Sequence, residues 1–217
     1  MKPFAITLLF IVAFACLRAT AQSSINNEVF KYKFKSEKNG ARVSYVGKSH
    51  SFTFDLKASE IKELQAQGAD DNMRFISVDK AIFQTSIVPM PQPIPGGLML
   101  GSLSPDQQKE IIEGYVEYEL DYYKQLGLKP IDLKKTWLTI NEKAFMVWEF
   151  DVDLDKNQTG QTGEQAKGQV YLVTPCFNQM WVINMPLMDR KDHERVKNIL
   201  TGIATSLKLY NTAQPQK

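Results

Sequence analysis

Residues 144–152 read Ala-Phe-Met-Val-Trp-Glu-Phe-Asp-Val, a run with apolar side chains at both alternating positions. Successive side chains of a strand point to opposite faces of its sheet. Met146 and Trp148 therefore share one face, and Phe145 and Val147 share the other. A strand that is apolar on both faces is buried on both, as in a sheet that helices cover. This stretch predicts a sheet packed between helices.

Three further strands are expected around this one. Residues 136–140 precede it across a turn at residues 141–142, and residues 169–176 and 180–185 form a second hairpin. A long polar loop, residues 155–168, joins the two hairpins. Strands joined by short turns pair in antiparallel fashion, so this part of the chain predicts an antiparallel sheet.

Two amphipathic helices flank these strands in the sequence. Ser104, Pro105 and Gln107 form a helix start, because the serine hydroxyl can accept from the third amide and the glutamine can reach back. Apolar residues and tyrosines then recur at helical spacing, and Gly127 is expected to end this helix. A second helix is expected over residues 192–209. The predicted fold is α+β, an α-β-α sandwich with a central antiparallel sheet.

The part of the chain before residue 89 is predicted to be mostly strands. A turn is expected at residues 39–40, which read Asn-Gly, and a short helix over residues 58–67. Strands are expected at residues 30–34, 42–46, 52–56, 74–78 and 81–88.

The C-terminal helix carries a family resemblance. Residues 198–207, Asn-Ile-Leu-Thr-Gly-Ile-Ala-Thr-Ser-Leu, look like the closing helix of the PsbP/DcrB-like superfamily, which includes the fold of Ran-binding nuclear-transport factors. The order of elements is similar over about residues 50–210. The resemblance implies a PsbP-like α-β-α sandwich. It also implies a binding or accessory role, because many members are exported and share no common catalytic residue.

The first residues have the layout of a secretory signal. Met1 and Lys2 give a positive start, residues 4–17 are almost continuously apolar, and residues 19–21 are small. The apolar run is shorter than the roughly 20 residues that a membrane-spanning helix needs. We therefore expect a signal peptide and a secreted or periplasmic mature chain without a transmembrane segment. Lipid anchoring at Cys16 is the less favoured alternative.

The chain is expected to divide into four parts. Residues 1–21 are the signal peptide, residues 22–49 are lead-in strands, residues 50–210 are a single PsbP-like domain, and residues 211–217 are a flexible tail. Removal of the signal takes away two basic residues and no acid, which leaves equal numbers of basic and acidic side chains. Nucleic-acid binding proteins usually carry a basic excess, so that class is not expected.

A Pro-rich segment, residues 89–103, is the candidate partner-contact region. Its prolines are too dense for a helix or a central strand, yet it also carries large apolar side chains. Such a loop either packs on the domain or is held out for a partner. The expected partner-contact residues are Met90, Ile94, Leu98 and Met99.

A calcium loop is the best chemical candidate in the sequence. Asp153, Asp155 and Asn157 occupy positions 1, 3 and 5 of a 12-residue frame, and Glu164 occupies position 12. Position 6 needs glycine for its sharp turn but holds Gln158. A solvated loop between strands is the alternative, so no metal or other cofactor is predicted.

Catalytic groups are sparse. A pair of Cys176 and His193 is conceivable, but nothing near Cys176 in the sequence suggests a lowered thiol pKa. The acids Asp189, Asp192 and Glu194 are explained by capping of a helix start. No catalytic residue is therefore predicted.

Two functional classes remain. The favoured one is an exported, non-catalytic binding or accessory protein of the cell envelope that contacts a protein or a small ligand. The alternative is a hydrolase-type enzyme with an unrecognised site, which would need titratable groups converging in a pocket.

Overall fold

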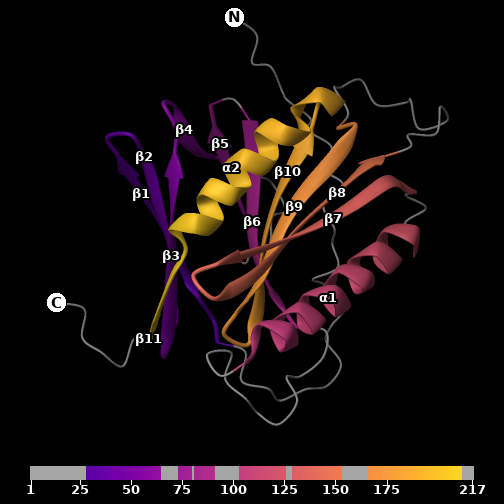
Figure 1. The fold of residues 1–217 in the computed structure, drawn as a ribbon. Coiled ribbons are helices and arrows are strands. Elements are labelled where there is room, and N and C mark those ends of the chain that lie inside the picture. The colour runs from indigo at the N-terminus through magenta and orange to yellow at the C-terminus, as the bar shows by residue number, and fades with distance from the viewer. Residues whose placement is uncertain are drawn as a thin grey trace, which may run out of the picture.

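The computed structural model describes residues 28–64, 73–79, 81–90, 103–125, 129–152 and 166–211. These residues form a mixed α+β structure with two helices and two antiparallel sheets (Figure 1). The elements in chain order are β1 (Lys31–Glu37), β2 (Gly40–Val46), β3 (His50–Lys57), β4 (Ile61–Leu64), β5 (Met73–Val78), β6 (Ala81–Pro89), α1 (Pro105–Gln125), β7 (Pro130–Ile140), β8 (Lys143–Val152), β9 (Gly168–Cys176), β10 (Gln179–Leu187), a 3-10 helix (Arg190–Asp192), α2 (His193–Ser206) and β11 (Lys208–Asn211). None of the helices in these ranges is long and apolar enough to cross a membrane.

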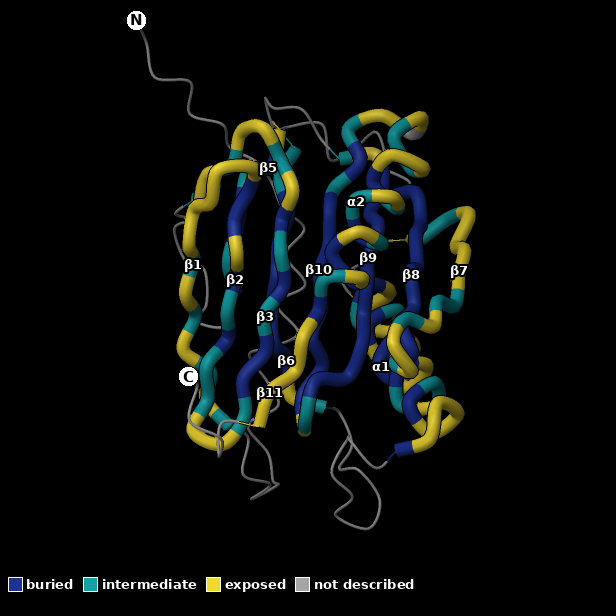
Figure 2. The backbone as a smooth tube through the Cα atoms, turned by 60° about the vertical axis from the view of Figure 1, so that its left-hand side comes forward, coloured by how far each residue is buried: buried dark blue, intermediate teal, exposed yellow. Residues whose placement is uncertain are grey.

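The larger sheet has seven strands in the order β4-β5-β6-β10-β9-β8-β7. Its central strands are dark blue along their length in Figure 2, which marks them as buried. The two predicted hairpins, β7–β8 and β9–β10, lie side by side in it, and β8 pairs with β9. The antiparallel arrangement expected from residues 136–185 is thus present.

Each face of this sheet carries its own hydrophobic core. On one face, Ile112 and Val116 of α1 pack against Met146 and Trp148 of β8. On the other face, Phe145 of β8 belongs to the core that includes the apolar residues of α2. Residues 144–152 are thus buried on both faces, as predicted, but the second sheet shares with α2 the core on one of these faces.

The described strands form two sheets where the sequence predicted one. The second sheet has four strands in the order β1-β2-β3-β11, and it shares the core on the α2 side. The β1–β2 hairpin turns at Lys38 and Asn39, one residue before the expected Asn39–Gly40 turn, and Gly40 pairs with Glu37 as the first residue of β2. Gly40 has φ 144°, which side chains disfavour, and a Cβ there would lie 1.8 Å from the Leu56 carbonyl oxygen. β2 therefore approaches β3 closely at this residue.

Two helix predictions need correction. The helix expected over residues 58–67 is not found in their described part, because Ile61–Leu64 pairs with β5 as strand β4. The C-terminal helix ends at Ser206, and Leu207 has extended backbone angles. Lys208–Asn211 then pairs with β3 as β11. In both places pairing with a neighbouring strand outweighs the local helical tendency.

Candidate functional site

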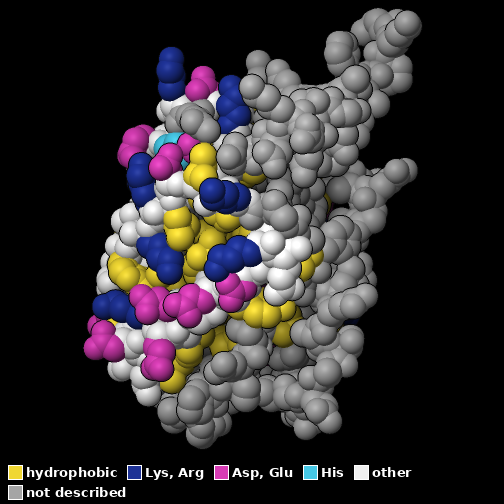
Figure 3. Space-filling view, turned by 90° about the vertical axis from the view of Figure 1, so that its right-hand side faces the viewer, with side chains coloured by type: hydrophobic (Ala, Val, Ile, Leu, Met, Phe, Trp, Pro, Cys, Tyr) yellow, Lys and Arg dark blue, Asp and Glu magenta, His cyan; other side chains and the backbone are white. Residues whose placement is uncertain are grey.

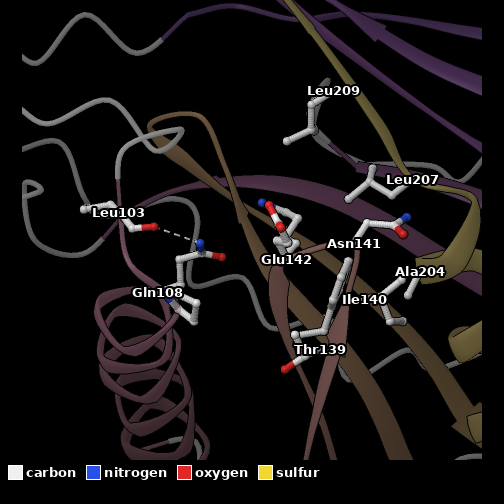
Figure 4. Close-up of a pocket in the computed structure, with 12 residues that line it drawn as sticks. Leu103, Gln108, Thr139, Ile140, Asn141, Glu142, Ala204, Leu207 and Leu209 are labelled. Carbon is white, nitrogen blue, oxygen red and sulfur yellow. Dashed lines mark hydrogen bonds between the residues drawn. The ribbon is translucent and has the colours of Figure 1, made fainter.

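A cleft of about 700 Å³ lies where three parts of the fold meet (Figure 4). The start of α1, the β7–β8 turn, and the segment from the end of α2 into β11 each supply part of its wall. Its lining residues are Leu103, Pro105, Gln108, Thr139, Ile140, Asn141, Glu142, Lys143, Phe145, Ala204, Leu207 and Leu209. Clefts of this size suit small molecules.

The α1 wall is fixed by hydrogen bonds at the helix start. Gln107 N–H donates to Ser104 Oγ at 3.2 Å, and Ser104 N–H donates to Gln107 Oε1 at 2.9 Å. This is the capping box that the sequence predicted. Gln108 then joins the helix to the sheet, because its side chain donates to the Leu103 carbonyl at 3.1 Å and accepts from Ala144 N–H at 3.1 Å.

The β7–β8 turn forms the second wall. Asn141 and Glu142 have φ values of 52° and 62°. Two consecutive residues in the left-handed region make the tight turn that suits the twist of a hairpin. The turn leaves both side chains exposed, and Figure 4 shows them between the Leu103–Gln108 side of the cleft and the Leu207–Leu209 side.

Lys143 is the cation of the cleft. Its Nζ donates to the Pro175 carbonyl oxygen. Burial lowers the pKa of Lys143, and the nearby Cys176 acts in the opposite direction. No carboxylate lies within ion-pair distance of Lys143 in the described part of the chain.

The third wall is apolar. Ala204 and Leu207 are buried with 1% and 9% exposure, and Leu209 is exposed. Leu207 N–H donates to the Ala204 carbonyl at 3.2 Å, which closes the end of α2 before the chain turns into β11. Phe145 also lines the cleft, so apolar side chains supply part of the surface that a ligand can bury.

A separate charged cluster anchors the start of α2 to β8. His193 Nδ1 lies 2.7 Å from Glu149 Oε2, and His193 Nε2 lies 3.3 Å from Asp151 Oδ1. Lys197 Nζ lies 3.5 Å from Glu149 Oε1, and both acids are buried. Among the described residues, no group of three or more His, Cys, Asp or Glu is arranged to hold a metal ion.

The acids expected to cap the last helix have different roles. Asp189 caps the 3-10 helix by accepting from Lys191 N–H at 3.0 Å. Asp192 makes no side-chain capping bond to α2, but its carboxylate accepts from Arg195 at 3.2 Å and that contact lowers its pKa. Capping thus accounts for Asp189, and an ion pair accounts for Asp192.

The conceivable pair of Cys176 and His193 is not formed. Asp151, a partner of His193, pairs with Gly168 at the start of β9, whereas Cys176 ends that strand. Burial also raises the pKa of the Cys176 thiol to about 11, which disfavours a thiolate.

The other predicted residues are only partly described. Met90 is half-buried and packs against the core under α1. Ile94, Leu98 and Met99 lie outside the described residues, as do residues 1–21. The calcium candidates Asp153, Asp155, Asn157 and Glu164 also lie outside them.

The cleft was not predicted from the sequence. Gln108 stands within the α1 pattern, and Lys143 opens a strand, so neither has a local signal of function. Their proximity depends on how α1, the β7–β8 turn and β11 meet, which spacing along one element does not reveal. A lysine directly before the apolar residues 144–148 is the sequence feature that could have drawn attention.

Comparison with known proteins finds a resemblance in structure. No protein-family model matches the chain, and no curated protein matches it in sequence. The solution structure of cyanobacterial PsbP (CyanoP) from Synechocystis sp. PCC 6803 is similar with a TM-score of 0.46 and 12% identity, over 88% of this chain and 99% of that one. This relative is itself a PsbP, the family that the order of elements over residues 50–210 resembles.

Proposed function

We propose that this protein is an exported, non-catalytic binding or accessory protein of the cell envelope, built as a PsbP-like α-β-α sandwich. The layout of residues 1–21 supports export to a secreted or periplasmic location. In this proposal the protein acts through surface contacts with a protein partner or a small ligand. It needs no cofactor and binds no nucleic acid.

The cleft between α1, the β7–β8 turn and β11 is the observation that carries the binding role. Its volume is about 700 Å³, and apolar side chains such as Phe145, Leu103 and Leu207 dominate its lining. Burial of apolar surface is the main source of affinity in such sites, while a few polar groups set the orientation of the ligand. The apolar residues Met90, Ile94, Leu98 and Met99 are the proposed contact with a protein partner.

Export is tested on the full chain with a C-terminal tag, expressed in its native host. Cell fractionation and N-terminal sequencing should find a chain that begins at Gln22 outside the cytoplasm. A chain that keeps residues 1–21 and stays in the cytoplasm would contradict the proposal.

Binding is tested by pull-down from the host envelope with the mature chain. A variant with serine at positions 90, 94, 98 and 99 should lose the recovered partner. The matched control is Leu133→Ser, since Leu133 is an apolar residue of β7 that is 40% exposed and lies outside the cleft. Hydrolysis of a panel of ester, amide and phosphoester substrates by the wild-type chain would instead favour the enzyme.

A further inference from the structure

Within the ranges that the structure describes, no acidic side chain forms an ion pair with Lys143 of the cleft. Lys143 lines the cleft, and its ammonium group has the Pro175 carbonyl as its hydrogen-bond acceptor. The nearby Cys176 thiol is buried and stays neutral, because its pKa is raised to about 11. A single carbonyl oxygen replaces only part of the hydration that a partly buried ammonium group loses.

The other charges at the cleft do not remove this imbalance. The positive end of α1 and the negative end of α2 both border the cleft, so their effects on a bound charge offset each other. Glu142 is exposed at the turn, where water screens its charge. Lys143 therefore determines which ligand charge the inner part of the cleft prefers.

We propose that the cleft binds a small amphiphile made of an apolar body and one carboxylate, with the apolar body against Phe145, Leu207 and Leu209 and the carboxylate paired with Lys143. This inference rests on the binding role proposed above and names the chemical class of the ligand. A carboxylate can accept a charge-assisted hydrogen bond from the ammonium group, which is stronger than a bond between neutral groups.

Dodecanoate serves as the probe, and dodecanol is the neutral comparison of the same chain length. Isothermal titration with the mature chain should show dodecanoate binding at least about tenfold more tightly than dodecanol, the effect of one charge-assisted hydrogen bond. Lys143→Met keeps the aliphatic stem and removes the charge. This variant should lose that tenfold advantage and still bind dodecanol.

Lys135→Met is the matched control, because Lys135 is an exposed lysine on the same hairpin and does not line the cleft. It should bind dodecanoate like the wild type. Retained dodecanol binding in Lys143→Met shows that the variant is folded. Equal affinity of the wild type for dodecanoate and dodecanol would overturn the proposal, and so would an unchanged dodecanoate affinity in Lys143→Met. Export and protein binding are tested in separate experiments. The ligand proposal can therefore fail while those two proposals hold, and they can fail while it holds.

Discussion

Alanine substitutions at two glycines should change the stability of the protein in opposite directions, because the surroundings of the two residues differ. At Gly40, φ is 144° and an added Cβ would lie 1.8 Å from the Leu56 carbonyl oxygen. Gly114 lies exposed within α1, with nothing within 4 Å of an added Cβ. Gly40→Ala should lower the free energy of unfolding by at least about 2 kcal/mol, through backbone strain and the clash. Gly114→Ala should raise it by about 0.5–1 kcal/mol, since alanine favours a helix.

Urea denaturation of the two variants measures both changes. Each variant is the control for the other, because both substitutions add one methyl group. A Gly40→Ala variant as stable as the wild type would contradict the close approach of β2 to β3 at this residue.

Glu119 makes the stability of the protein depend on pH. This side chain is 3% exposed in α1, and burial raises its pKa from 4.5 to about 7. The folded protein therefore holds a proton on Glu119 between about pH 4.5 and pH 7, where the unfolded chain has released it. The stabilisation is complete below pH 4.5 and is lost as the pH rises through 7. From 1.36 kcal/mol per pKa unit, the loss is about 3 kcal/mol.

Glu119→Gln should remove this loss, because the amide stays neutral at every pH. Urea denaturation between pH 4 and pH 8 measures the free energy of unfolding of the variant and the wild type. Glu117→Gln is the control, since Glu117 is exposed on the same helix. Parallel pH profiles for the wild type and Glu119→Gln would show that Glu119 is not responsible.

At the scale of elements, the capping box decides where α1 begins. Ser104 and Gln107 exchange hydrogen bonds of 3.2 and 2.9 Å. Ser104→Ala and Gln107→Ala should each lower the free energy of unfolding by about 1 kcal/mol, because each leaves an amide of the helix start without its partner. Gln125→Ala is the control, since Gln125 is an exposed glutamine at the other end of α1. Thermal unfolding measures all three, and an equal effect of Gln107→Ala and Gln125→Ala would rule out the capping role.

Elements with strong local signals were predictable, and elements that depend on distant pairing were not. The start of α1 and the double-sided burial of β8 follow from residue types at fixed spacing, and the structure contains both. β4 and β11 are four-residue strands that form because β5 and β3 offer them an edge. The cleft belongs to the second kind, since its walls come from three separate parts of the chain.

The face of the molecule over α1 and β7 carries both acidic and basic side chains. Figure 3 shows a row of acidic side chains beside basic ones, with apolar side chains between them. On α1 the exposed acids recur at helical spacing at Asp106, Glu110, Glu113, Glu117 and Asp121. On β7, an edge strand, Lys134 and Lys135 are exposed. Lysines on an exposed edge oppose pairing with another chain, so this edge is protected from aggregation.

The two sheets are joined through the hydroxyl group of Thr85. Trp181 Nε1 of β10 donates to Thr85 Oγ1 of β6 at 3.0 Å, and Tyr45 Oη of β2, in the other sheet, lies 3.2 Å from the same oxygen. Thr85→Val keeps the shape of the side chain and leaves two buried polar groups without this partner. The free energy of unfolding should fall by about 2–4 kcal/mol.

One core contains residues of both sheets and of α2. The lower stability of Thr85→Val should therefore affect the unfolding of both sheets together. Urea unfolding followed by tryptophan fluorescence and by far-UV circular dichroism should move together to lower urea in Thr85→Val. Thr136→Val is the control, since Thr136 is exposed on β7. The three tryptophans, Trp137, Trp148 and Trp181, all belong to the larger sheet. If only the fluorescence transition moved, the larger sheet would unfold separately from the rest of the protein, which would contradict a shared core.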